Sequence, residues 1–150
     1  MKKLLTVFIS SLVILTLAGI TFAAEPSYVG GAKCKMCHMK QFKVWEGTKH
    51  AKAFDALKPE EQKDPKCIKC HTTGPEGKIQ NIECEACHGA GSEYKAAPIM
   101  KDKEKAKAAG LILGDEQTCK KCHNEESPTF KGFNFKEAWE KIKHPKAPKE

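Results

Sequence analysis

Apolar and polar positions divide the chain into a short apolar leader and a long polar remainder. Residues 4–20 are apolar except for small and hydroxyl side chains, with lysines before them and the small residues Thr21 and Ala23 after them. This order is typical of an export signal. We therefore expect residues 1–23 to be a cleaved signal peptide and residues 24–150 to form a single domain in the periplasm. If the signal stays uncut, it becomes a membrane anchor.

The remainder shows helical rather than strand periodicity. The clearest helix is expected over residues 135–144, where Asn134 and Glu137 form a capping pair and Pro145 follows His144 as a stop. The pattern predicts a mainly α fold, a small helical domain with long loops. The other expected elements are a helix over 34–57 with a break near Gly47, a helix over 101–109, a helix capped by Asp115 that carries the last two cysteines, and a short strand at 78–82.

Composition narrows the choice of partners. The residues after the leader are poor in Leu, Ile and Val, so the polypeptide alone would build only a thin core. The net charge is +7, and all 26 cationic side chains are lysines. Without arginine the chain lacks bidentate recognition of phosphate and guanine, and export takes it away from nucleic acid. We therefore expect no nucleic-acid partner and a core completed by something other than aliphatic side chains.

All eight cysteines occur in one pattern, Cys-x-x-Cys-His, which is used four times. This is the attachment motif of c-type haem. Two cysteines three residues apart lie on one side of a helical turn, where their sulfurs reach the porphyrin while the next imidazole reaches the iron. We expect four covalently bound haem c groups, each with iron, that form much of the core. The motifs contain Cys34, Cys37 and His38; Cys67, Cys70 and His71; Cys84, Cys87 and His88; and Cys119, Cys122 and His123.

Other uses of paired cysteines explain the sequence less well. The second and third pairs have nearly the spacing of a zinc ribbon, and export permits disulfides. Neither use needs a histidine after each second cysteine. The chain has only 6 histidines, so four such coincidences have a chance probability on the order of 10⁻⁶. A thioredoxin-like redox motif would not occur four times without a βαβ pattern.

Two histidines lie outside the motifs, His50 and His144. A haem iron takes a second axial ligand, and imidazole is a common one. We expect both residues to be distal iron ligands. Two irons are then left without an intrachain histidine. For these irons Met100, Tyr94, a lysine, water or a histidine of a neighbouring chain stay open as ligands.

Segments around the motifs carry a further similarity: Tyr28-Val29-Gly30, Trp45 with 49–51, 70–74, 84–89 with Gly91 and Ser92, 122–124 with Ser127 and Pro128, and 139–144. In this order they resemble the tetrahaem cytochrome c-554 family. The resemblance implies a mainly helical fold, stacked haem pairs, mostly bis-histidine iron and periplasmic electron transfer. It also implies one five-coordinate haem, at the second motif and hence at His71. One position departs from the family, because Tyr94 stands where such sequences often carry a histidine.

The expected function is an electron carrier that exchanges electrons with redox partner proteins, whose identity the sequence does not give. Two alternatives stay open. One is reduction of a small nitrogen oxide at an open haem, and the other is a subunit of a polymeric haem wire. The enzyme is disfavoured because all four motifs end in histidine, no arginine is present, and no catalytic set stands apart from the haem residues. The oligomeric state is left open.

Overall fold

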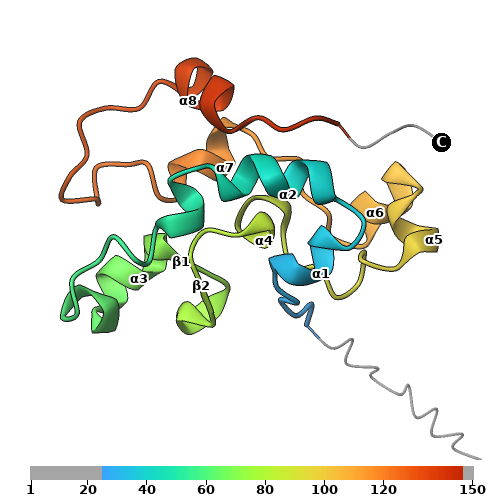
Figure 1. Cartoon of the computed structure of the whole chain (residues 1–150), viewed down its shortest axis with the longest axis horizontal. Coiled ribbons are helices and arrows are strands. Elements are labelled where there is room, and N and C mark those ends of the chain that lie inside the picture. The colour runs from blue at the N-terminus through green and yellow to red at the C-terminus, as the bar shows by residue number, and fades with distance from the viewer. Residues whose placement is uncertain (1–24, 147–150) are drawn as a thin grey trace, which may run out of the picture.

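The computed structural model describes residues 25–146, and the predicted signal peptide lies outside them. The fold is mainly α with long loops, as expected (Figure 1). The helices are α1 (Gly31–Lys35), α2 (Met39–Glu46), α3 (Pro65–His71), α4 (Cys84–His88), α5 (Ala97–Met100), α6 (Lys103–Ala108), α7 (Glu116–Lys120) and α8 (Phe135–Ile142). Single 3-10 turns occur at His50–Lys52, Glu61–Lys63 and Pro75–Gly77, and the strands are β1 (Thr72–Thr73) and β2 (Ile79–Gln80).

A small hairpin joins the second motif to the third. Strands β1 and β2 are antiparallel, with Thr72 opposite Gln80 and Thr73 opposite Ile79. The strand expected at 78–82 is therefore present, and its partner is the pair of threonines that directly follows α3. Figure 1 shows α3 and this hairpin toward one end of the molecule and the α5–α6 pair toward the other.

Two helices begin at the caps predicted from their sequences, and a third is capped by a residue that was not predicted. Asp115 accepts a hydrogen bond from the Thr118 N–H at 2.8 Å, and Asn134 accepts one from the Glu137 N–H at 3.2 Å. The polar helix expected at 101–109 starts instead at Lys103, because Asp102 caps it by accepting from the backbone of the next turn. Side-chain oxygens satisfy N–H groups that have no partner inside the helix, which fixes where each helix begins.

Two helix boundaries differ from the expected ones. The helix predicted over 34–57 breaks at His38, which leaves helical geometry with φ −113° and ψ 42°. It also ends at Glu46, so residues 47–57 contain only the 3-10 turn His50–Lys52 where a continued helix was predicted. The last helix ends at Ile142, so His144 lies beyond it and not at its final position. The residue before a proline is disfavoured in the α region, and here Lys143 already turns to ψ 135°.

The polypeptide core is thin. Among the described residues the only buried apolar side chains are Tyr94 and Ala106. The two largest fully buried side chains, Glu85 and Thr73, are polar. Large apolar side chains such as Leu113 and Trp139 stay exposed to the extent of 48% and 38%. This agrees with a chain whose apolar surface is completed by its cofactors. Within residues 25–146 no helix has the length and apolar character needed to cross a bilayer.

Candidate haem-binding sites

Each Cys-x-x-Cys-His motif lies on or beside a short helix, as the spacing predicts. The second and third motifs are helical through their histidines, in α3 and α4, whereas α1 and α7 end soon after the first cysteine of their motifs. No disulfide joins any of the eight cysteines, all of which belong to the described residues. The attachment chemistry is therefore available at all four motifs.

The first motif lies against the third. The Cys34 thiol forms a hydrogen bond with Cys84, which is the largest cause that raises the pKa of Cys34, ahead of burial. Helices α1 and α4 also pack together, and a Cβ at Gly31 would lie only 3.6 Å from the Cys84 sulfur.

The second motif lies against the fourth. Burial, followed by the charge of Cys70 and a hydrogen bond with it, raises the pKa of Cys122 to about 12. The third motif also approaches the fourth, because Cys119 contributes, after burial, to the raised pKa of Cys87. Only thirteen residues separate Cys70 from Cys84 in the sequence, yet the contacts between cysteines join other pairs of motifs. The motifs thus form a row in the order first, third, fourth, second.

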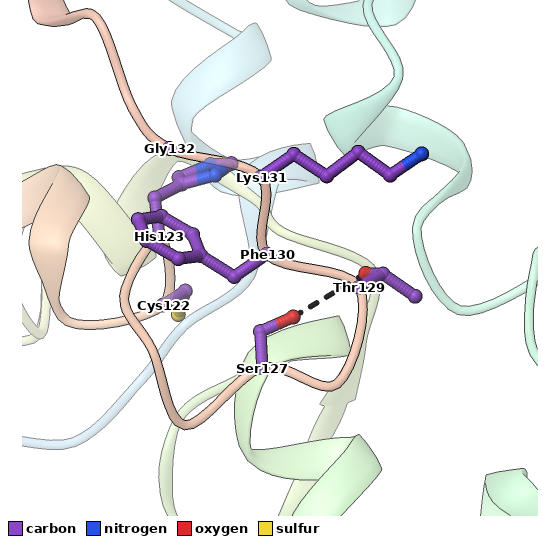
Figure 2. A pocket seen from close by; sticks show the side chains of 7 residues that line it. All are labelled: Cys122, His123, Ser127, Thr129, Phe130, Lys131 and Gly132. Atoms are coloured by element: carbon purple, nitrogen blue, oxygen red, sulfur yellow. Dashed lines mark hydrogen bonds between the residues drawn. The ribbon is translucent and has the colours of Figure 1, made fainter.

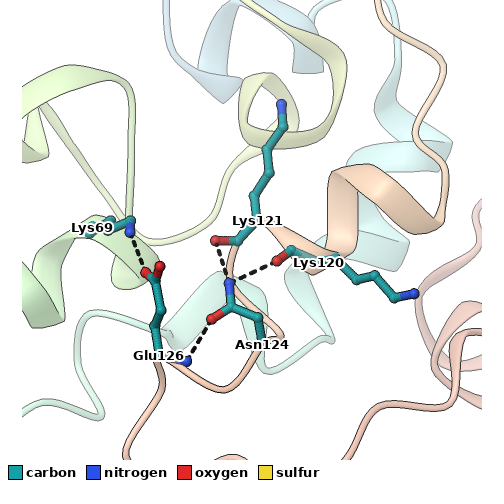
Figure 3. A network of polar contacts seen from close by, with 5 residues as sticks. All are labelled: Lys69, Lys120, Lys121, Asn124 and Glu126. Carbon is teal, nitrogen blue, oxygen red and sulfur yellow. Dashed lines mark hydrogen bonds and ion pairs between the residues drawn. The ribbon is translucent and has the colours of Figure 1, made fainter.

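Polar contacts hold the turn after the fourth motif onto the second motif (Figure 3). The Lys69 ammonium pairs with the Glu126 carboxylate at 2.7 Å. The Asn124 amide donates to the Lys120 carbonyl at 2.8 Å and accepts from the Glu126 N–H at 2.8 Å. The ion pair is exposed and contributes little stability by itself. The role of the ion pair is to connect α3 to the segment that follows α7.

Four of the six histidines form two imidazole pairs. The ring centroids of His50 and His123 are 6.1 Å apart, and those of His88 and His144 are 5.8 Å apart. An iron between two imidazoles requires about this separation, because each metal–nitrogen bond is about 2.1 Å and each centroid lies about 1.1 Å behind its nitrogen. The pairs therefore fit bis-histidine iron, and both histidines outside the motifs are members of them.

Helix α2 and the segment before α4 position the two histidines outside the motifs, His50 and His144. The Trp45 indole donates to the Ile82 carbonyl at 2.7 Å, and the Ile82 N–H donates to the His50 carbonyl at 3.1 Å. The Gln41 amide donates to the Pro145 carbonyl at 3.1 Å, which ties the residue after His144 to the same helix. Residues far apart in sequence thus place both imidazoles.

Hydrogen bonds select the tautomer of two motif histidines. The Nδ1–H of His71 donates to the Ala53 carbonyl at 2.5 Å, and that of His88 donates to the Ile112 carbonyl at 2.9 Å. A carbonyl only accepts, so Nδ1 carries the proton and Nε2 is left free for a metal. Burial lowers the pKa of His88 and of His50, which favours the neutral imidazole that binds iron.

His38 and His71 are in neither of the imidazole pairs, although all six histidines belong to the described residues. Tyr94 is 5% exposed, and its hydroxyl contacts the carbonyls of Gly89 at 2.6 Å and His88 at 3.1 Å. Burial is the largest cause that raises the pKa of Tyr94. Its hydroxyl is thus engaged by the backbone, which argues against Tyr94 as a ligand.

One hollow is lined by residues on either side of His50 in the sequence, and a second has His123 in its wall. The first, of about 330 Å³, is lined by Lys49, which precedes His50, and by Lys52. The other, of about 230 Å³, contains His123 in its wall, and Figure 2 shows the Phe130 ring beside that histidine. Neither could be anticipated from motif spacing. The second hollow is lined by Cys122, His123, Ser127, Thr129, Phe130, Lys131 and Gly132.

Comparisons with known proteins point to one family. A family model described as "Cytochrome c554 and c-prime" matches residues 33–89, which contain the first three motifs. Cytochrome c-554 of Nitrosomonas europaea is 28% identical over 155 aligned positions, which cover 77% of this chain and 66% of that protein. The structure of reduced cytochrome c554 from the same organism matches with a TM-score of 0.58 and 26% identity, over 75% of this chain and 73% of that one.

Proposed function

Since the chain belongs to the cytochrome c-554 family of multihaem c-type cytochromes, we propose that it is a periplasmic carrier that passes electrons between redox partner proteins. Four covalent haem c groups and an electron-transfer role agree with the relatives and with the four motifs. The proposal adds the compartment, the route of the electrons and the partner proteins.

Each haem supplies one-electron chemistry at its iron, and the chain determines its attachment and ligation. We assign the motif cysteines to the thioethers and the motif histidines to the proximal positions. His50 is the distal partner of His123, and His144 is the distal partner of His88. The observation that carries this assignment is the pair of ring separations, 6.1 and 5.8 Å, in a chain with no other spare histidine.

The order in which the motifs follow one another in space supports an electron carrier. A row in which each site lies near the next offers a path for electrons through the molecule, and little polypeptide is left for a substrate pocket. Lys121 lies beside the fourth motif and extends away from the ion-paired residues in Figure 3. Lys69 and Lys120 are paired with Glu126 and Glu116, so they contribute less to any attraction of an acidic partner.

Stopped-flow oxidation of the reduced protein by an acceptor cytochrome, repeated across ionic strength, tests the carrier. We expect fast exchange whose rate falls as salt rises, because lysine charges steer the encounter. Turnover of nitrite, nitric oxide and hydroxylamine is measured with the same preparation. Negligible turnover supports the carrier, and sustained turnover at tens per second, a rate ordinary for enzymes, overturns it.

A second candidate is reduction of a small nitrogen oxide, and one observation favours it. His38 and His71 have no partner imidazole in the described pairs, so two irons lack a distal histidine from this chain. Catalysis would also need hydrogen-bond donors preorganised at the distal position of such an iron. With no arginine in the chain, lysines are the cationic donors available. The turnover assays above separate the two candidates.

A further inference from the structure

A buried carboxylate lies between the first and third motifs and has no part in haem attachment. Glu85 directly follows Cys84 and is 1% exposed. Its two oxygens accept hydrogen bonds from the backbone N–H groups of Val29 at 2.9 Å, Gly30 at 2.8 Å and Gly91 at 2.6 Å. A carboxylate that only accepts is in its charged form, and several N–H donors make such a charge tolerable inside a protein.

A second carboxylate extends this arrangement along the backbone. Glu83 accepts from the Gly31 N–H at 2.6 Å, so three consecutive N–H groups at the start of α1 are bound by side chains around α4. Further along, the Ser27 N–H donates to the Ser92 hydroxyl at 2.8 Å, and the Ser92 N–H donates to the Ser27 carbonyl at 3.1 Å. We call residues 27–31 together with 83–92 the carboxylate clamp.

Glycines make the close approach in the clamp possible. A Cβ at Gly91 would lie 2.9 Å from a Glu85 carboxyl oxygen, closer than real Cβ contacts, and at a tight 3.1 Å from the Val29 side chain. Gly30 has φ +83°, a conformation that other residues rarely adopt. The sequence therefore provides both the carboxylate and the space in which the backbone surrounds it.

We propose that Glu85 is a positioning residue for electron transfer: it fixes the first motif against the third and places a permanent negative charge beside both haems, which lowers their reduction potentials. Glu85 is adjacent to Cys84 in the third motif, and Cys84 contacts Cys34 of the first. A negative charge stabilises the ferric haem over the ferrous haem, and it acts strongly where water is excluded. The proposal rests on haem attachment at these two motifs and is independent of the identity of the partners.

The decisive variant is Glu85→Gln in the fully matured protein, with spectroelectrochemical titration of all four haems. Gln keeps the shape of Glu and removes the charge. We expect two of the four potentials to rise, each by about 59 mV, which corresponds to a tenfold change for a one-electron couple. Glu125→Gln is the matched control, because Glu125 is exposed and lies two residues after His123. Four potentials that move no more than in this control would overturn the proposal.

Haem counting keeps the test decisive if the Gln variant matures poorly. Mass spectrometry of the intact chain and of its peptides then shows which motifs have lost haem. Loss confined to the first and third motifs supports the positioning role, and loss spread evenly over four motifs contradicts it. Glu85→Asp keeps the charge and shortens the side chain, so we expect a lower melting temperature with potentials near those of the wild type. A rise in Glu85→Asp as large as the predicted tenfold change overturns the role of charge.

Discussion

At the scale of single residues, the positions of the imidazoles support the proposed assignment of the iron ligands. Motif spacing identifies the four proximal histidines, but the sequence could not say which spare histidine faces which motif. The pairing joins His50 to His123, 73 positions later, and His144 to His88. Such distances in sequence are closed only by tertiary contacts, and no local pattern reports them.

Replacing a distal histidine should change the spin state of one haem. In His50→Ala we expect one low-spin haem to become high-spin, because its iron loses the second imidazole, and we expect its potential to shift. His144→Ala should do the same to a different haem. Near-infrared and visible spectra with electron paramagnetic resonance give the readout, and Lys49→Ala is the neighbouring control. A wild-type spectrum for His50→Ala would remove that residue from the site.

The indole of Trp45 should contribute to the ligation of the haem assigned to His50 and His123. Trp45→Phe keeps an aromatic ring and removes the N–H that donates to the Ile82 carbonyl. We expect a stability loss of about 1 kcal/mol, typical of one lost hydrogen bond, and a partly high-spin fourth haem. Trp139→Phe is the control, because Trp139 is 38% exposed. Equal spectral changes in both variants would show that ring size, rather than the hydrogen bond, matters.

At the scale of elements, local chemistry predicts where helices begin better than where they end. Asp115 and Asn134 cap α7 and α8 as their sequences indicate, since a side-chain oxygen acts within one turn. The break at His38 and the early end at Ile142 were missed. The clamp was missed as well, because Glu85 resembles any glutamate on a helix until its backbone partners are known, and two of the three, Val29 and Gly30, are more than fifty positions away in the sequence.

The cap of α7 should make stability depend on pH. Hydrogen bonds from Thr118 lower the pKa of Asp115 below its ordinary 3.8. The stabilisation is therefore complete above pH 3.8 and is lost as the pH falls through the lowered folded value. Asp115→Ala should lower the melting temperature at pH 7, whereas Asp115→Asn, which still caps, should melt close to the wild type there. As the pH falls below 3.8 and through the lowered pKa of Asp115, the gap between the wild type and Asp115→Ala should narrow, and a gap that stays constant contradicts this account.

At the scale of the whole molecule, four haems on so short a chain replace the aliphatic core. Motif counting was sufficient to predict this, whereas the order of the sites in space required the structure. Replacing both cysteines of the third motif by serine should remove one haem and should destabilise the protein, because little buried apolar packing can compensate. Intact mass and thermal unfolding measure the two effects. A chain that loses the haem and unfolds at the wild-type temperature would contradict a core built on cofactors.

Carbon monoxide should bind the reduced protein at two haems. Four irons share six histidines, and the two imidazole pairs account for the irons at His88 and His123. The irons at His38 and His71 are then open. Spectrophotometric titration under anaerobic conditions gives the number of sites, and light scattering of the same sample gives the oligomeric state. A monomer with four low-spin haems that refuses carbon monoxide would require other ligands, such as Met100 or a lysine.

The row of motifs has one further consequence, which concerns the difference between its ends and its interior. In the order first, third, fourth, second, the interior positions are the two with imidazole pairs, and the ends are His38 and His71, which have none. The row can be compared to a short wire in which only the two interior sites have both axial histidines from this chain. Under the proposed ligation, the two interior irons have both axial positions filled and keep their geometry on reduction, whereas the two end irons can bind an exogenous ligand. Such a row has no built-in direction of electron flow, so the partner proteins decide at which end haem electrons enter.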